Sequence, residues 1–221
     1  MTLGLIMLLS VWLINQYTSS RLEPVVAHLN SEMSNIKTQL RTWHDSGVDE
    51  SVVPESLWLQ RTVCSSRERQ EFESRLSQLG TTMTQADLVE LRAWFDRCGT
   101  VVARRDLTTA LMIELYVDQL VRLSSYADRL IDDGIISVDQ FVRADILSWQ
   151  EWSRAWQHYA ALQIELDELQ RSLIEARYQG VAVEDQQIQS ILDVVADTQA
   201  TMNDQRTKKD EAFKALTKYE S

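Results

Sequence analysis

Residues that interrupt helices are scarce in this chain. It contains only 6 glycines and 2 prolines among 221 residues. A protein made of many short strands needs more turns than so few glycines and prolines supply, so the composition argues against a β architecture. Instead, apolar residues recur at helical spacing through most of the sequence. We therefore predict an all-α fold, in the form of an elongated antiparallel helical bundle or coiled coil.

The first seventeen residues differ in character from the rest. Residues 1–17 carry no charge and are mostly apolar. A helix from Leu3 to Tyr17 would be about 22 Å long, which is short against a hydrocarbon core of roughly 30 Å. We expect residues 1–17 to be a short N-terminal membrane segment, retained as a signal anchor, because no Lys or Arg precedes the apolar run as a cleaved signal peptide requires. A cleaved signal peptide and a membrane helix that begins outside this sequence are the alternatives.

A heptad pattern comes next in the chain. The sequence from Ser20 to Glu23 has the form of a capping box, which predicts that a new helix begins there. We predict a heptad helix over residues 18–47, ended by Gly47, and a linker over residues 48–54. The repeated apolar residues pack either against a second copy of the chain or within the chain, and both alternatives stay open. The seam between copies would be formed by Leu22, Leu29, Ile36 and Trp43.

The positions of the two cysteines bear on the cellular compartment in which the body of the protein lies. Residues 55–79 and 85–98 both show helical periodicity and are separated by a turn around Gly80, which predicts an antiparallel hairpin within a helical bundle over residues 55–221. Cys64 and Cys98 are equally distant in sequence from residue 81, so they should face each other across the hairpin. We predict a disulfide between them; the alternative is two buried free thiols. A structural disulfide implies an oxidising compartment, which would place the body outside the cytoplasm, on the periplasmic or extracellular side.

Three more helices are expected after the hairpin, which Gly99 should end. The first begins near Asp106 and ends at Asp132. The second opens with a capping box at Ser137 and meets no helix breaker before Gly180. The third runs over residues 184–218.

An aromatic stripe is the most unusual local pattern. Its residues are spaced by three, four and three positions, so they share one face of a helix. Antiparallel pairing about Gly180 places this face beside residues 206–213, where Arg206, Lys208 and Lys209 could supply cation–π contacts. Such rings either form a ligand or partner site or, more simply, fill the core between helices. The stripe consists of Trp149, Trp152, Trp156 and Tyr159.

Composition and motifs exclude several functions. A net charge of −11 and the absence of a basic patch argue against nucleic acid as a partner. No histidine has a glutamate three residues before it, and the motifs for haem attachment, zinc hydrolysis and phosphate binding are absent. The acidic run from His44 to Glu50 fits a helix end better than a metal site. We expect no metal, no cofactor and no catalytic residue.

These features together predict a membrane-anchored, extracytoplasmic helical scaffold or interaction protein without catalytic activity. Its partners would be the membrane, through the N-terminal segment, and either another protein or a second copy of this chain. The alternative is a ligand-binding sensory bundle that uses the Trp149, Trp152 and Trp156 stripe for a small molecule. A secreted enzyme is a third and weaker hypothesis, because histidine and free cysteine are so few.

Overall fold

The computed structural model describes the backbone of residues 2–48, 71, 74–76, 78–81, 83–142 and 144–219, and the side chains of these residues except 2–21, 98–102 and 219. The described part of the chain is helical and contains no strand, which confirms the all-α class. The membrane segment expected at residues 1–17 is not seen, since none of the described helices combines the length and apolar character needed to cross a membrane.

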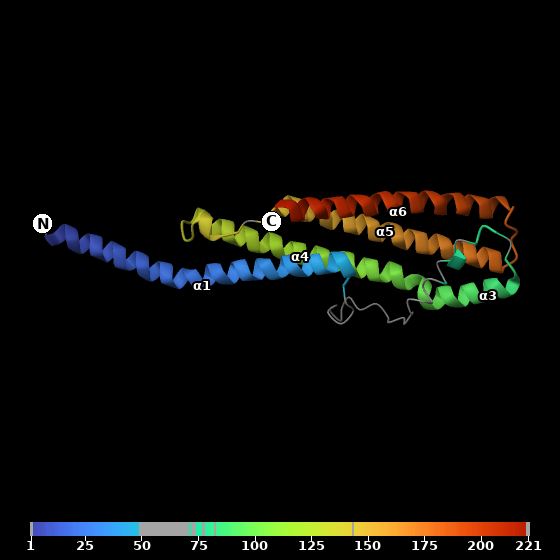
Figure 1. Cartoon of the computed structure of the whole chain (residues 1–221), viewed down its shortest axis with the longest axis horizontal. Helices are drawn as coiled ribbons and strands as arrows, with labels where there is room; N and C mark the ends of the chain where they lie inside the picture. Colours follow the sequence, from blue (N-terminus) through green and yellow to red (C-terminus); the bar gives the residue numbers. More distant parts are fainter. Residues whose placement is uncertain are drawn as a thin grey trace.

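The helices lie along one long axis (Figure 1). Three of them, α4 (Thr100–Asp132), α5 (Ile146–Tyr178) and α6 (Gln186–Tyr219), run side by side, and α5 contacts both of the others. Helix α3 (Gln85–Trp94) packs against α5 at one end. Helix α1 (Thr2–Ser46) lies along α4 and projects past the other end (Figure 1). We call residues 22–48 together with α3 to α6 the helical body, and residues 2–21 the projecting part of α1.

Helix α1 does not begin where the sequence pattern suggested. It passes without a break through Ser20 and keeps Pro24 inside it. Pro24 has no amide hydrogen for the Ser20 carbonyl, and its ring crowds that carbonyl, which bends helices. Figure 1 shows α1 changing direction where it enters the body. The cost of an internal proline, about 3 kcal/mol, is offset by the buried face on the C-terminal side of it.

The heptad face of α1 is buried within this chain. Leu29 is 5% exposed, Ile36 is 6% exposed and Trp43 is 4% exposed, whereas Leu22 is only half-buried. The three buried side chains belong to one core cluster with residues of α4 and α5. Three of the four residues that the sequence offered to a second copy are therefore covered by the chain's own helices. Gly47 ends α1 as expected, with a φ of +74° that favours glycine and an amide that donates to the Trp43 carbonyl over 2.9 Å.

Gly99 does not end a helix. One π-helical turn, Phe95–Gly99, joins α3 directly to α4, so no helix begins at Asp106, which lies buried inside α4. A glycine within a helix costs about 1 kcal/mol relative to alanine. The buried neighbours Phe95 and Ala103 offset that cost by packing.

The long helix expected from Ser137 begins later. Ser137 does form a capping box, but it opens only the 3₁₀ turn η4 (Val138–Gln140). The side chain of Asn30 in α1 donates to the Gln140 carbonyl over 2.9 Å and accepts from the Val142 amide over 3.2 Å. These backbone groups are occupied by α1, so the helix restarts at Ile146, where Asp145 caps it.

Two separate cores stabilise the body. The larger one unites the heptad face of α1 with α4, the first half of α5 and the end of α6. The smaller one lies where α3 packs against the end of α5 and the start of α6. Arg177 closes the smaller core, since its guanidinium donates to the Val181 carbonyl over 3.0 Å and to the Thr81 carbonyl over 3.3 Å.

Candidate functional site

The aromatic stripe of α5 lies inside the larger core. Trp149 is 1% exposed, Trp152 is 0% exposed and Trp156 is 5% exposed, while Tyr159 is half-buried. Neighbouring rings meet edge to face, with centroids 5.5 Å apart for Trp149 and Trp152 and 6.0 Å apart for Trp156 and Tyr159. Such geometry matches the favoured contacts of packed aromatic rings. The three tryptophans are therefore core residues, as the simpler of the two hypotheses held.

The predicted neighbour of this stripe on α6 is confirmed. The ammonium nitrogen of Lys209 lies 3.9 Å from the centre of the Trp156 ring and 5.4 Å from the centre of the Tyr159 ring. Lys209 is buried, which strengthens a cation–π contact because water does not compete with it. Lys208 points elsewhere and pairs with Asp204 over 2.7 Å on the exposed side of α6.

His44 joins this cluster, although no local pattern in the sequence indicated that it would. Its imidazole, in the last turn of α1, stacks on the Phe213 ring with centroids 3.7 Å apart and lies 5.8 Å from Trp152. Its Nε2 atom is 3.8 Å from a carboxylate oxygen of Asp210, and the same oxygen is 3.3 Å from the Lys209 ammonium. His44 and Lys209 thus share one carboxylate, which fastens the end of α1 to α6.

Burial sets the protonation of these groups. Removal from water lowers the pKa of Lys209, and the nearby Asp210 carboxylate opposes that change. Burial also lowers the pKa of His44, with the positive charge of Lys209 acting in the same direction and Asp210 and Asp45 acting against it. The imidazole of His44 is therefore neutral near pH 7. Burial raises the pKa of Tyr159, so its hydroxyl stays protonated there.

An open pocket of about 440 Å³ lies over the cluster at the junction of α1 and α6. Both carboxylates and cationic groups line it, so neither an anion nor a cation meets a surface of one sign. The stripe contributes no residue to its lining, which means that a ligand in this pocket would contact the stripe only through its neighbours. The lining residues are His44, Asp45, Arg206, Lys209, Asp210, Phe213 and Lys214.

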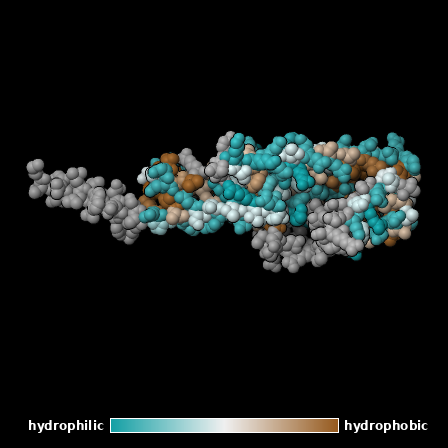
Figure 2. Space-filling model, in the orientation of Figure 1, coloured by the Kyte–Doolittle hydropathy of each residue, from teal (hydrophilic) through white to brown (hydrophobic). Residues whose placement is uncertain are grey.

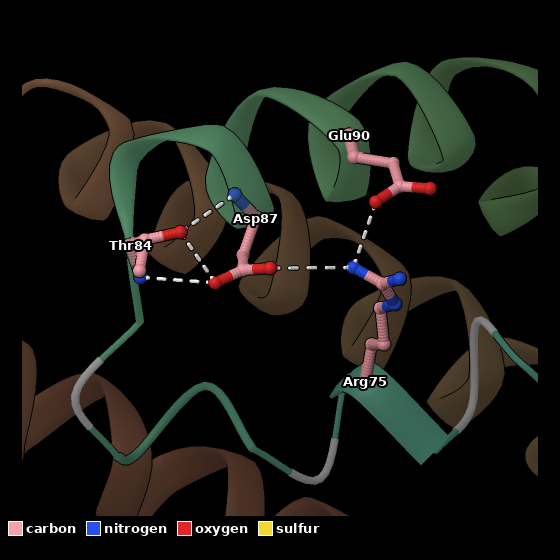
Figure 3. A network of polar contacts seen from close by, with 4 residues as sticks. All are labelled: Arg75, Thr84, Asp87 and Glu90. Atoms are coloured by element: carbon pink, nitrogen blue, oxygen red, sulfur yellow. Dashed lines mark hydrogen bonds and ion pairs between the residues drawn. The ribbon is translucent and has the colours of Figure 1, made fainter.

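A second polar network lies at the start of α3 (Figure 3). Arg75 pairs with Glu90 over 2.9 Å and approaches Asp87 over 3.7 Å, while its guanidinium lies 5.0 Å above the Trp94 ring. The side chains of Thr84 and Asp87 cap the start of α3 reciprocally, and the hydrogen bond from Thr84 lowers the pKa of Asp87. These contacts fix α3 to the segment before it, and an open pocket of about 580 Å³ borders them.

The predicted disulfide stays a prediction. Cys64 lies outside the residues that the structure describes, and Cys98 falls in the π-helical turn but its own side chain is not described. Among the described residues, no group of three or more His, Cys, Asp or Glu side chains is arranged to hold a metal ion.

Exposed apolar side chains gather at the end of the body from which α1 projects (Figure 2). This end comprises the last turns of α4, the connection to α5, the first turn of α5 and the adjoining part of α1. We call its apolar residues the apolar end. They are Val25, Tyr126, Ile135, Val138, Val142 and Leu147, with exposed fractions between 39% and 71%.

Comparison with known proteins found no matching protein-family model, curated protein or solved structure.

Proposed function

We propose that this protein is a helical scaffold or interaction protein that its apolar N-terminal segment attaches to a membrane. One observation carries the proposal, namely the continuity of α1. The uncharged apolar run from Leu3 to Tyr17 lies in the projecting part, and the same helix supplies the heptad face of the larger core.

An apolar helix that leaves the body needs apolar surroundings, because exposing it to water is costly. The apolar run is about 22 Å long as a helix, roughly 8 Å less than a hydrocarbon core. A short segment of this kind is accommodated by local thinning of the bilayer, at fractions of a kcal/mol per Å of mismatch. Membrane insertion of this segment is therefore physically feasible.

The scaffold role is inferred from how the anchor meets the body. Residues such as Leu29 and Leu40 bury the same helix in the core, so no loop separates the membrane segment from the body. Helices α4, α5 and α6 have 33, 33 and 34 residues. Each is therefore about 50 Å long. An antiparallel bundle of this length would hold a partner surface well away from the bilayer.

The side of the membrane on which the body lies is inferred from the predicted disulfide between Cys64 and Cys98. If that bond forms, the body lies in an oxidising compartment, periplasmic or extracellular. A protein partner or a second copy would then bind the body there.

The pocket beside His44 and Lys209 favours a second function, ligand sensing. A small molecule bound there would contact Phe213 and reach Trp156 only through Lys209. Saturable quenching of tryptophan fluorescence by a small molecule would support this function over the scaffold.

Flotation with phosphatidylcholine vesicles tests the membrane attachment. The full chain should float with the vesicles and stay with them after alkaline carbonate extraction. A variant with Leu8→Asp and Leu9→Asp should remain in the dense fraction, because a charge within the apolar segment costs about 2.5 to 3.5 kcal/mol. Val89→Asp, at an exposed position of α3, is the matched control and should float. A parent chain that stays in the dense fraction would refute the proposal.

A further inference from the structure

We infer that the apolar end of the helical body is itself a membrane-contact surface, seated in the headgroup region of a zwitterionic bilayer. This inference rests on the proposed membrane attachment and adds to it a second contact, made by the folded body.

The distribution of exposed apolar side chains supports this surface. Among the described residues, six of the nine large apolar side chains that are exposed belong to the apolar end. The other three, Val89, Leu115 and Val194, lie on three different helices. Single exposed apolar residues are common on soluble proteins, whereas a gathering of them marks an interaction site.

The apolar end is also firmly placed beside the projecting part of α1. The side chain of Asn30 in α1 hydrogen-bonds to both the Gln140 carbonyl and the Val142 amide, so the connection from α4 to α5 is fixed to α1 eight residues after the body begins. Ile136 and Phe141 anchor the same connection to the body, since both side chains are buried in the larger core. Val138 and Val142 are thereby held outward on a fixed loop, with 56% and 66% of their surfaces exposed.

The continuity of α1 with the apolar run indicates that a bilayer is the occupant. The body begins five residues after Tyr17 on the same unbroken helix, so its adjoining end lies within about 8 Å of the end of the run. The part of the body that adjoins this segment is the apolar end. Its side chains would enter the boundary between headgroups and acyl chains, where partly buried apolar residues of interfacial segments reside.

The negative charge near the apolar end favours a zwitterionic lipid over an anionic one. Among the described residues of this connection and the helix ends beside it, Asp132, Asp133, Asp139 and Asp145 are exposed, and Arg129 is a cation in the last turn of α4. The sequence adds a second cation, Arg143, to the connection, so carboxylates outnumber cations four to two. Carboxylates in this number are repelled by an anionic surface. Contact with a zwitterionic phosphatidylcholine surface carries no such penalty, and adding anionic lipid should weaken it.

Photo-crosslinking to lipid tests the inference on the full chain in phosphatidylcholine vesicles. Benzoylphenylalanine replaces Val142 in one variant and Val194 in another; both positions are exposed, but Val194 lies on α6, away from the apolar end. Both variants are first floated with vesicles and then irradiated. We expect a lipid adduct at position 142, detected by mass, and none above background at position 194.

The outcomes distinguish the membrane attachment through the N-terminal segment from the membrane contact made by the apolar end. Flotation with an adduct at position 142 alone supports the inference. Flotation without an adduct there, or with crosslinks to a second copy of the chain instead, overturns the inference and leaves the membrane attachment standing. Failure of both variants and of the parent chain to float overturns the attachment and the inference together. A variant at Leu147, the most exposed of these residues at 71%, repeats the measurement on α5.

Discussion

The ammonium nitrogen of Lys209 lies 3.9 Å from the centre of the Trp156 ring, within the larger core. This contact joins α6 to α5, and Asp210 extends it to His44 at the end of α1. Helices α1, α5 and α6 therefore meet at one cation and its neighbours. The stability of this meeting point, and its dependence on pH, can be measured.

Trp156→Ala should destabilise the protein by about 3 to 5 kcal/mol, because a large buried ring is lost and a cavity remains. Chemical denaturation should show a lower midpoint with little change in slope. Tyr126→Ala, which removes an exposed aromatic ring from α4, is the control and should change the midpoint little. A loss below about 1 kcal/mol for Trp156→Ala would mean that the ring lines an open site instead of filling the core.

Lys209→Met should raise the pKa of His44, since the positive charge of Lys209 is one of the causes that lower it. The methionine keeps most of the side-chain volume, so the fold should persist with a loss of about 2 kcal/mol, the size of a desolvated cation–π contact. Titration of the imidazole C–H resonances by NMR measures the shift. Lys208→Met is the matched control, because Lys208 pairs with Asp204 on the exposed side of α6. An unchanged His44 titration in Lys209→Met would contradict this arrangement of charges.

The stability of the protein should fall as the pH drops below about 6.5, the ordinary pKa of histidine. The folded chain holds His44 at a lower pKa than the unfolded chain does, so the unfolded chain binds the proton first. The contribution of His44 is therefore fully present above this pH and is lost as the pH falls toward the lowered, folded-state value. The charged groups around the imidazole are Lys209, Asp210, Asp45, Arg206 and Lys214.

His44→Phe tests this pH dependence, since phenylalanine can still stack on Phe213 but cannot titrate. The buried Nδ1 atom of His44 has no hydrogen-bond partner, so its loss leaves no acceptor or donor stranded. Urea midpoints at about pH 7.5 and about pH 5.5 should differ less in His44→Phe than in the parent chain. His158→Gln, at an exposed position of α5, should keep the parent's difference. An equal difference in all three proteins would show that other groups cause it.

The cross-helix neighbours of the stripe could be predicted from the sequence because antiparallel pairing conserves the sum of residue numbers. That rule needs only a turn, and Gly180 supplies one with a φ of +88°. The rule placed the stripe beside residues 206–213, and it is within this segment that Lys209 contacts Trp156 and Phe213 contacts Trp152. It could not place His44, because no single turn relates α1 to α6.

The helix starts predicted from the sequence were wrong where a tertiary contact or a preceding helical segment outweighed the local capping pattern. Ser20 begins a capping pattern, but the apolar run before it is already helical, so there is no free helix start to cap. Ser137 does cap, yet Asn30 occupies the backbone groups that would have continued the helix. Neither competing contact is visible in a local window of sequence.

Replacing Leu29 and Ile36 together by Asp should unfold the body, because both side chains are buried in the larger core of the single chain. Circular dichroism should show loss of the cooperative thermal transition, and light scattering of the parent protein gives its assembly state. Asp at Ser31 and Thr38, on the exposed face of the same helix, is the matched control and should leave the transition intact. A double variant that stays folded but loses mass would instead reveal a seam between two copies.

The Cys64–Cys98 disulfide should form in material recovered from the native compartment, because the two residues are equally distant from residue 81. It would close a loop of about 35 residues and stabilise the chain by roughly 3 to 4 kcal/mol in the chain-entropy model. Non-reducing peptide mass mapping should recover one linked pair, and reduction should lower the denaturation midpoint. Reductant should have no such effect on a variant with both residues changed to Ser. Two free thiols, or a bridge between two chains, would remove the basis for placing the body outside the cytoplasm, since that argument depends on this bond alone.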